Sequence, residues 1–280
     1  MVHAIPPITG PTLSANEPTA SPAPFYLHFQ NITRRFSVRT PYGTDTLTAL
    51  DHVSLGARPR EIIAVVGPSG CGKSTLLSLG AGLDAPSEGS VRIGDVEVHG
   101  PHPDVAFMLQ KDLLLPWRTI IENVTFGTEI RGVPAKLRRE RAQALLARFG
   151  LAGFADRYPR QLSGGMRQRA ALARTMALDP AILLMDEPFS ALDAQTKLTL
   201  QGELARTVRA ANVTAVIITH DLTEAVVLAD RIYVMSARPG RIVREIKVDL
   251  ADCTDPVERY FSKDTQDYVK DMWSTLASFH

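Results

Sequence analysis

The 280-residue chain has few cysteines and no long hydrophobic run, and each absence excludes a class of protein. Its two cysteines, Cys71 and Cys253, are too few for a disulfide framework, so a reducing, intracellular setting is expected. No apolar run is longer than five residues, whereas a membrane-spanning helix needs about 20. We therefore expect a chain that does not cross a bilayer by itself.

The chain also lacks an excess of charge of either sign. Lysine and arginine total 31, and aspartate and glutamate total 30, so no global field favours a polyanion and we expect no nucleic-acid partner. A local basic cluster fits a solvent-exposed helix face better than a phosphate-binding surface: Arg131, Lys136, Arg138, Arg139 and Arg141. Apolar residues are abundant, at 45% of the chain. A chain of this length can bury about three quarters of the surface that it exposes when unfolded.

The two ends of the chain differ from its middle. Residues 1–24 hold six of the 19 prolines and one charged side chain, Glu17, which predicts a disordered, proline-rich leader without the apolar run of a secretory signal. Residues 246–280 are predicted to form a helical tail. Apolar side chains recur there at helical spacing: Tyr268, Met272, Leu276 and Phe279. We favour packing of this tail on its own domain over binding of a partner.

Residues 25–245 are predicted to form one α/β domain. Period-two alternation at 25–30, and a further plausible strand at 47–55, indicate an early antiparallel part, and residues 91–98 predict a hairpin with a two-residue Gly-Asp turn. Short apolar runs of the buried, parallel type follow at 62–66, 182–185, 215–218 and 231–235. Helices are predicted at 135–149 and 194–210. This alternation favours a parallel sheet, with a helical insert at about 111–162.

A phosphate loop follows the first buried run directly and leads into a helix. The motif comprises Gly67, Pro68, Ser69, Gly70, Cys71, Gly72, Lys73, Ser74 and Thr75. Its glycines let backbone N–H groups turn toward phosphate oxygens, and the helix points its positive end at the same place. Lys73 is expected to reach the terminal phosphates of a bound nucleotide, and the Ser74 hydroxyl is expected to ligate Mg²⁺.

Cys71 lies inside this loop, where the positive end of the helix favours a thiolate. One hypothesis is that alkylation of Cys71 blocks ATP hydrolysis and that ATP protects against it. A shielded thiol at a tolerant position is the alternative.

A second acidic site is predicted where the run at 182–185 ends. Asp186 is expected to hold Mg²⁺ through its water shell, and Glu187 is expected to orient or deprotonate the attacking water. Two adjacent acids could also mark an ordinary exposed strand end. The phosphate loop makes that alternative less favourable.

The segment that distinguishes among phosphate-loop proteins is Leu162-Ser163-Gly164-Gly165-Met166-Arg167-Gln168-Arg169. It matches the signature of ATP-binding cassette (ABC) transporters, and the chain resembles their nucleotide-binding subunits over about 25–241. The resemblance implies a P-loop NTPase core of the ABC type with an antiparallel β subdomain and a helical insert subdomain. It also implies a head-to-tail dimer, in which Ser163, Gly164 and Gly165 of one copy close over the γ-phosphate of ATP bound by the other.

Further positions match the family in order. By this resemblance, Gln110 approaches Mg²⁺ and the reactive water, and His220 contacts the γ-phosphate. Asp193 ends a D-loop, Ser190-Ala191-Leu192-Asp193, and can also cap the next helix. Phe36 is placed like the aromatic residue that stacks on adenine. Tyr42 competes for that role, and Phe36 could instead be a core residue.

An apolar stretch, Leu113 to Trp117, follows Gln110. It could plug a local core or form a patch for a partner. The sequence of this stretch is similar to that of the nitrate, sulfonate and taurine importer subfamily. Three other segments share the similarity: Glu122-Asn123-Val124, Asp186-Glu187-Pro188-Phe189 and Arg238-Pro239-Gly240-Arg241. That resemblance implies docking of a separate transmembrane permease at the cytoplasmic face of the inner or plasma membrane, and a periplasmic or extracellular solute-binding protein acting indirectly.

The other hypothesis is a soluble ABC ATPase that acts on nucleic acid or ribosomes. Residues 110–163 carry no heptads for the long coiled coil of repair and chromosome ATPases, and the chain has one phosphate loop rather than two. The importer hypothesis is therefore preferred. Sulfonate, taurine, nitrate, bicarbonate and a thiamine precursor all stay open as the transported solute.

Overall fold

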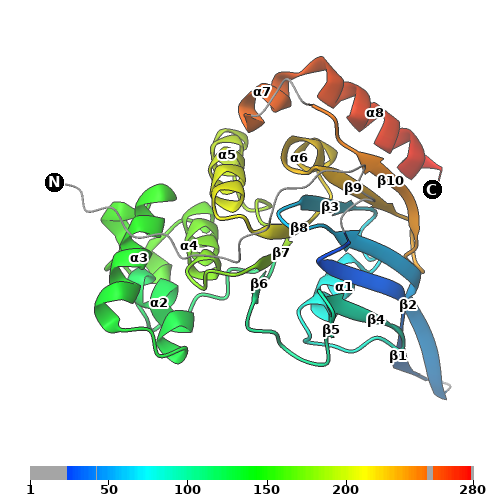
Figure 1. Cartoon of the computed structure of the whole chain (residues 1–280), viewed down its shortest axis with the longest axis horizontal. Coiled ribbons are helices and arrows are strands. Elements are labelled where there is room, and N and C mark those ends of the chain that lie inside the picture. The colour runs from blue at the N-terminus through cyan, green and yellow to red at the C-terminus, as the bar shows by residue number, and fades with distance from the viewer. Residues whose placement is uncertain (1–23, 42, 251–254, 279–280) are drawn as a thin grey trace, which may run out of the picture.

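Two sheets and a helical lobe make up the fold (Figure 1). The computed structural model describes residues 24–41, 43–250 and 255–278. A six-stranded sheet has the order β10-β9-β3-β8-β7-β6, and a four-stranded sheet has the order β2-β1-β4-β5. Most of the predicted leader, residues 1–23, lies outside the described residues.

The six-stranded sheet is built on the predicted apolar runs. Its strands are β3 (Ile62–Val66), β6 (Val105–Met108), β7 (Ile182–Asp186), β8 (Thr214–Thr219), β9 (Arg231–Met235) and β10 (Ile242–Lys247). All pairings in it are parallel except that of β10 with β9. Every residue of β3, β7, β8 and β9 is buried, since helices or the second sheet cover both faces. The four predicted parallel strands are thus confirmed.

The second sheet is antiparallel and precedes the helical lobe in sequence. It comprises β1 (Leu27–Thr40), β2 (Gly43–Ala57), β4 (Glu88–Ile93) and β5 (Val96–Glu97). The predicted hairpin is confirmed: Ile93 pairs with Val96, and Gly94 in the turn has a φ of 55°. β1 is longer than expected from alternation, because register shifts between Phe29 and Arg35 interrupt the period of two while pairing continues.

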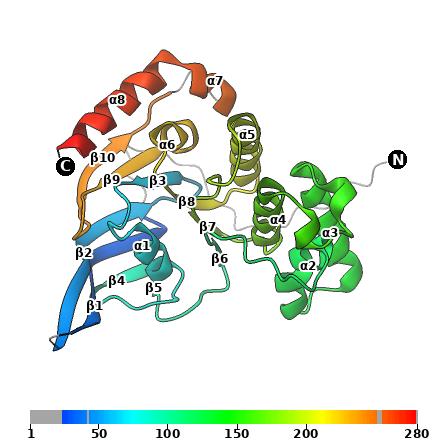
Figure 2. The same ribbon diagram turned by 180° about the vertical axis from the view of Figure 1, so that it is seen from behind.

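Helix α1 (Lys73–Gly80) lies between the two sheets, where Leu76, Leu77 and Leu79 share one core with both. The helical lobe contains α2 (Ile120–Ile130), α3 (Ala135–Arg148) and α4 (Gly164–Met176), with short 3-10 turns at Ala152–Phe154 and Pro159–Gln161 (Figure 2). Because α4 shares its core with α2 and α3, the helical part continues past residue 162. Pro134 is the N-cap residue of α3.

The remaining helices cover the six-stranded sheet. They are α5 (Ala194–Ala210), α6 (Leu222–Leu228), α7 (Pro256–Phe261) and α8 (Lys263–Ala277). Met272 of α8 is fully buried in a core that includes Leu222 and Val226 of α6, so the described part of the tail packs on its own domain, as favoured from sequence. Phe279 lies outside the described residues, and β10 continues past residue 245. None of the described helices is long and apolar enough to span a membrane.

Candidate functional site

The phosphate loop joins β3 to α1 and takes a shape that only glycine allows at two positions. Gly70 and Gly72 have φ angles of 77° and 106°, in the left-handed region. A Cβ on Gly72 would also lie 2.7 Å from Leu50 Cδ2 and 3.0 Å from the Ala49 carbonyl oxygen. The Lys73 ammonium folds back and donates to the carbonyl oxygens of Gly67 (2.8 Å) and Pro68 (2.9 Å).

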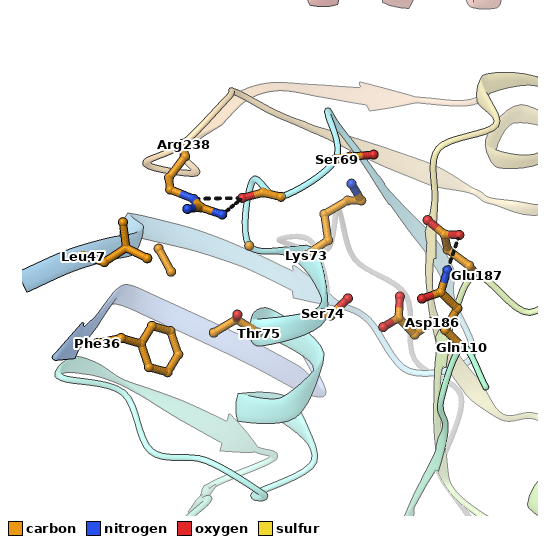
Figure 3. Close-up of a pocket in the computed structure, with 13 residues that line it drawn as sticks. Phe36, Leu47, Ser69, Lys73, Ser74, Thr75, Gln110, Asp186, Glu187 and Arg238 are labelled. Atoms are coloured by element: carbon orange, nitrogen blue, oxygen red, sulfur yellow. Dashed lines mark hydrogen bonds between the residues drawn. The ribbon is translucent and has the colours of Figure 1, made fainter. Parts of the chain in front are cut away.

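A cavity of about 390 Å³ opens in front of this loop (Figure 3). It is lined by Phe36, Leu47, Ala49, Ser69, Gly70, Gly72, Lys73, Ser74, Thr75, Gln110, Asp186, Glu187 and Arg238. Ten of these residues are predicted site residues, although they come from four separate stretches of sequence. The cavity therefore combines the N-terminus of α1 with the ends of β6 and β7 and with the hairpin of β1 and β2.

Asp186 ends β7 beside the start of α1. Its side chain is buried, with the residue 6% exposed, and it accepts a hydrogen bond from the Ser74 hydroxyl. Burial raises the pKa of Asp186, and the nearby Glu187 carboxylate raises it further, while Ser74 and Lys73 oppose the shift. The Asp186 carboxylate and the Ser74 hydroxyl are oxygen ligands of the kind that Mg²⁺ prefers, so these two side chains fit this metal.

Gln110 and His220, the other two predicted catalytic residues, both contact Glu187. Gln110 Nε2 donates to Glu187 Oε2 at 2.9 Å, and His220 Nδ1 lies 3.0 Å from Glu187 Oε1. The three residues follow the ends of β6, β7 and β8, which are neighbours in the sheet. Glu187 has a φ of 47°, a strained backbone for a residue other than glycine, and its N–H donates to the Ile218 carbonyl at 2.9 Å.

Phe36 and Leu47 lie at the other end of the cavity (Figure 3). Phe36 pairs with Leu47 across β1 and β2, and both side chains line the cavity. The Arg34 guanidinium lies 4.6 Å from the centroid of the Phe36 ring. Phe36 is therefore a cavity-lining residue and not a core residue. Its competitor Tyr42 lies outside the described residues.

The signature lies at the start of α4 and does not line this cavity. The Ser163 hydroxyl caps the helix by accepting from the Met166 N–H at 3.3 Å. A Cβ on Gly165 would lie 2.8 Å from Leu192 Cδ2, so the signature packs against the predicted D-loop. Asp193 caps α5 by accepting from the Thr196 N–H at 3.0 Å, as expected, and it too is absent from the cavity lining.

The Cys71 side chain is shielded. The residue is 1% exposed, and its Sγ lies 3.8 Å from Lys73 Nζ. Alkylating reagents need access to the thiol. The hypothesis of a reactive Cys71 is therefore disfavoured, and the shielded alternative fits the structure.

Sequence reasoning missed three residues that line the cavity: Leu47, Ala49 and Arg238. Leu47 could have been found from the hairpin register, because it lies opposite Phe36. Arg238 belongs to a loop 168 positions after Gly70, whose carbonyl accepts from its Nε at 3.1 Å and its Nη2 at 2.9 Å. No local pattern predicts such a contact.

The fold and the cavity together define a phosphate-loop ATPase. The ABC transporter family model matches residues 50–190, and the chain belongs to this family. It is 48% identical over 224 residues to an uncharacterized ABC transporter ATP-binding protein, MJ0412, of Methanocaldococcus jannaschii, covering 80% of this chain and 82% of the relative.

Relatives with named functions are similarly close. A taurine import ATP-binding protein, TauB, of Chromobacterium violaceum is 47% identical, covering 76% of this chain and 81% of its own. A nitrate import ATP-binding protein, NrtD, of Synechocystis is 44% identical, covering 73% and 77%. A solved structure of the ATP-binding cassette MJ0796, a dimer bound to ADP and phosphate, superposes with a TM-score of 0.72 at 31% identity, covering 79% of this chain and 98% of that one. The chain is thus an ATP-binding, ATP-hydrolysing cassette.

Proposed function

We propose that this chain is the energy-coupling ATPase subunit of an ABC importer. It works as a head-to-tail dimer on the cytoplasmic face of the membrane and drives a separate permease for a small anionic or related solute. The names of the taurine and nitrate import relatives support the importer class. Relatives of equal similarity without a named solute leave the individual solute open, so the proposal goes no further than this class.

The observation that carries the hydrolytic part of the proposal is the Gln110–Glu187–His220 cluster beside the phosphate loop. Glu187 accepts the proton of the attacking water, and Gln110 and His220 position its two carboxylate oxygens. His220 then contacts the γ-phosphate. Adenine stacks on the Phe36 ring, opposite the face that Arg34 covers.

Lys73 and the α1 N-terminus bind the phosphates, which draw the Lys73 ammonium away from the carbonyls of Gly67 and Pro68. Ser74 would ligate Mg²⁺, Asp186 would hold it through its water shell, and the Gln110 amide oxygen would approach it. When bound, Mg²⁺ neutralises charge on the phosphate oxygens. Within the described residues no group of three or more His, Cys, Asp and Glu could hold a metal ion, so the site depends on Asp186 together with hydroxyl, amide and phosphate oxygens.

The position of the signature supports a dimer. Ser163, Gly164 and Gly165 open α4 but do not line the cavity of their own chain. A second copy, related by a two-fold axis, brings its signature onto the nucleotide held here, and its D-loop comes with it. ATP then lies between two chains.

The Leu113 to Trp117 segment supports a permease contact. Leu114 is buried, while Leu113 and Trp117 are 53% and 71% exposed, so the segment is part core plug and part surface. Fully buried Asn123 fixes it: Asn123 Nδ2 donates to the Leu115 carbonyl at 3.1 Å, and Asn123 Oδ1 accepts from the Leu115 N–H at 2.7 Å. The exposed side chains are therefore held on a rigid backbone, as an interface anchor requires.

The same segment is tied to the signature helix. Arg174 of α4 donates to the carbonyls of Asp112 and Leu113, each at 2.7 Å, and Arg167 Nε donates to Asp112 Oδ2 at 3.0 Å. A partner helix docked on Leu113 and Trp117 would therefore move together with α4. Closure of the ATP dimer would pull the permease halves together through this connection.

Glu187→Gln tests the proposal. The variant keeps ATP affinity but lowers turnover by roughly a hundredfold or more, which is the scale of general-base loss, and it accumulates an ATP-bound dimer. Turnover and size-exclusion elution with ATP are the measurements. Glu140→Gln, an exposed residue on α3, is the matched control and should behave as wild type. Near-normal turnover of Glu187→Gln would remove Glu187 from the mechanism.

A further inference from the structure

Arg238 lies in the loop between β9 and β10, beside the phosphate loop. Its Nε and Nη2 both donate to the Gly70 carbonyl oxygen, at 3.1 and 2.9 Å, and it lines the same cavity as Lys73 and Phe36 (Figure 3). No predicted role accounts for this residue.

The loop that carries Arg238 is firmly placed. The Gly240 N–H donates to the Ala49 carbonyl at 2.9 Å, and the Gly240 carbonyl accepts from the Asp51 N–H at 3.0 Å. A Cβ on Gly240 would lie 2.1 Å from the Cys71 carbonyl oxygen, so the loop packs directly on the phosphate loop. Arg238 is thus held beside the cavity by backbone contacts.

Within the part of the chain that the structure describes, no carboxylate neutralises the charge of Arg238. Among the described residues it forms no ion pair, whereas Arg241 in the same loop donates from Nε to Asp51 Oδ2 at 2.9 Å. A guanidinium has five N–H donors, and the two bonds to Gly70 leave three. A cation with free donors at the wall of a nucleotide cavity suits phosphate oxygens, which guanidinium groups bind in a forked geometry.

We propose that Arg238 is a further nucleotide-binding residue, whose guanidinium fixes the Gly70 carbonyl with one edge and binds phosphate oxygens of ATP with its remaining donors. This proposal rests on the ATP-dependent function proposed above and extends its site. The Gly70 contact also holds the orientation of the peptide unit between Gly70 and Cys71, so the phosphate loop keeps its shape before the nucleotide arrives.

The test compares Arg238→Ala, Arg238→Lys and Arg241→Ala. Arg241 is the matched control, because it lies in the same loop but does not line the cavity. ATP affinity is measured by titration calorimetry, KM and kcat by phosphate release, and folding by thermal unfolding. We expect Arg238→Ala to weaken ATP binding and raise KM about tenfold, the scale of a lost charge-assisted hydrogen bond, with a smaller change in kcat. Arg238→Lys restores part of the affinity, since lysine keeps the charge but not the fork.

Three outcomes decide the matter. If Arg241→Ala leaves ATP affinity unchanged while Arg238→Ala loses it, the proposal stands. If Arg238→Ala binds ATP as the wild type does, or if both variants weaken binding equally, Arg238 only stabilises its loop and the proposal is wrong. A wild-type chain that bound no ATP would instead overturn the proposed function itself.

Discussion

Asp186 is a buried acid whose ionisation acts against the fold. Burial, followed by repulsion from Glu187, raises the pKa of Asp186, although Ser74 and Lys73 oppose this. Its pKa is therefore higher in the folded chain than in the unfolded chain. The ionised side chain lowers stability at neutral pH, and this cost disappears as the pH falls through the folded-state pKa toward the unfolded-state value.

Asp186→Asn should therefore raise the free energy of unfolding at neutral pH, in protein free of nucleotide and divalent cation. The gain should shrink as the pH falls through the raised folded-state pKa of Asp186, because the wild-type carboxyl becomes protonated there. Urea denaturation at several pH values measures this. The same variant should lose ATP turnover by about a hundredfold or more, because the proposed site would lose a carboxylate that holds Mg²⁺.

A gain in stability that did not depend on pH would mean that ionisation of Asp186 does not destabilise the folded chain. Ser74→Ala offers a control from the other side of the same hydrogen bond. It removes the donor that stabilises the carboxylate, so it should lower stability at neutral pH and lose that effect in acid.

At the scale of elements, the strands in which every residue is buried could be predicted from the sequence. The runs that became β3, β7, β8 and β9 are apolar throughout because both faces of the sheet are covered, and this pattern shows in any short window. The phosphate loop, Asp186 and Glu187 could be predicted because their chemistry depends on neighbours in sequence, and the signature could be predicted because its residues match the family motif. Gln110, His220 and Phe36 were found only through the family resemblance.

What sequence could not supply is contact between distant segments. The extent of β1 was missed because register shifts hide its alternation, and Leu47 joins the cavity only through its pairing with Phe36. Arg238 reaches Gly70 across 168 positions, in a loop whose place is set by β2. The contact between Arg238 and Gly70 depends on packing of the whole chain, and one sequence carries no local sign of it.

The segment before α2 yields a prediction about the membrane. Leu113→Ala with Trp117→Ala should abolish association with permease-containing membranes and transport, while ATP binding and thermal unfolding of the isolated subunit stay near wild type. Both side chains are largely exposed, so their removal leaves the core intact. Co-sedimentation with membranes and solute uptake measure the result.

Trp273→Ala is the matched control for this double variant. Trp273 is 68% exposed on α8, in the C-terminal tail, so it tests whether loss of any exposed tryptophan has the same effect. Equal loss of membrane association in both proteins would argue against a specific docking site. Normal transport by the double variant would place the docking site elsewhere.

At the scale of the whole molecule, the proposed dimer predicts that each ATP site is shared between two copies of the chain. In a head-to-tail dimer each site uses the phosphate loop of one copy and the signature of the other. Lys73→Ala and Gly164→Asp should each be nearly inactive alone, since one loses phosphate binding and the other places a negative charge at the signature. A Cβ on Gly164 meets nothing closer than 3.9 Å, so the second variant should fold.

An equal mixture of these two variants should regain ATPase activity. A dimer with one copy of each has one site with both parts intact, so about a quarter of the wild-type sites in a random mixture are restored. Titration of one variant into the other, followed by phosphate release, measures this. Activity that stayed at the level of the separate variants would contradict sites shared between two copies.

Asn123 has a consequence for how such a subunit diversifies. Its one amide nitrogen donates to the carbonyls of Leu115, Arg118 and Thr119, at distances of 2.9 to 3.1 Å. The backbone of the Leu113 to Trp117 segment is thus held from within the chain, independently of the outward-facing side chains of Leu113 and Trp117. Substitutions at those two positions therefore leave the backbone of the segment in place, whereas a change at Asn123 removes the contacts that hold it. Under the proposed docking, the chain would be matched to a new permease by altering the outward side chains alone, with the nucleotide site unchanged.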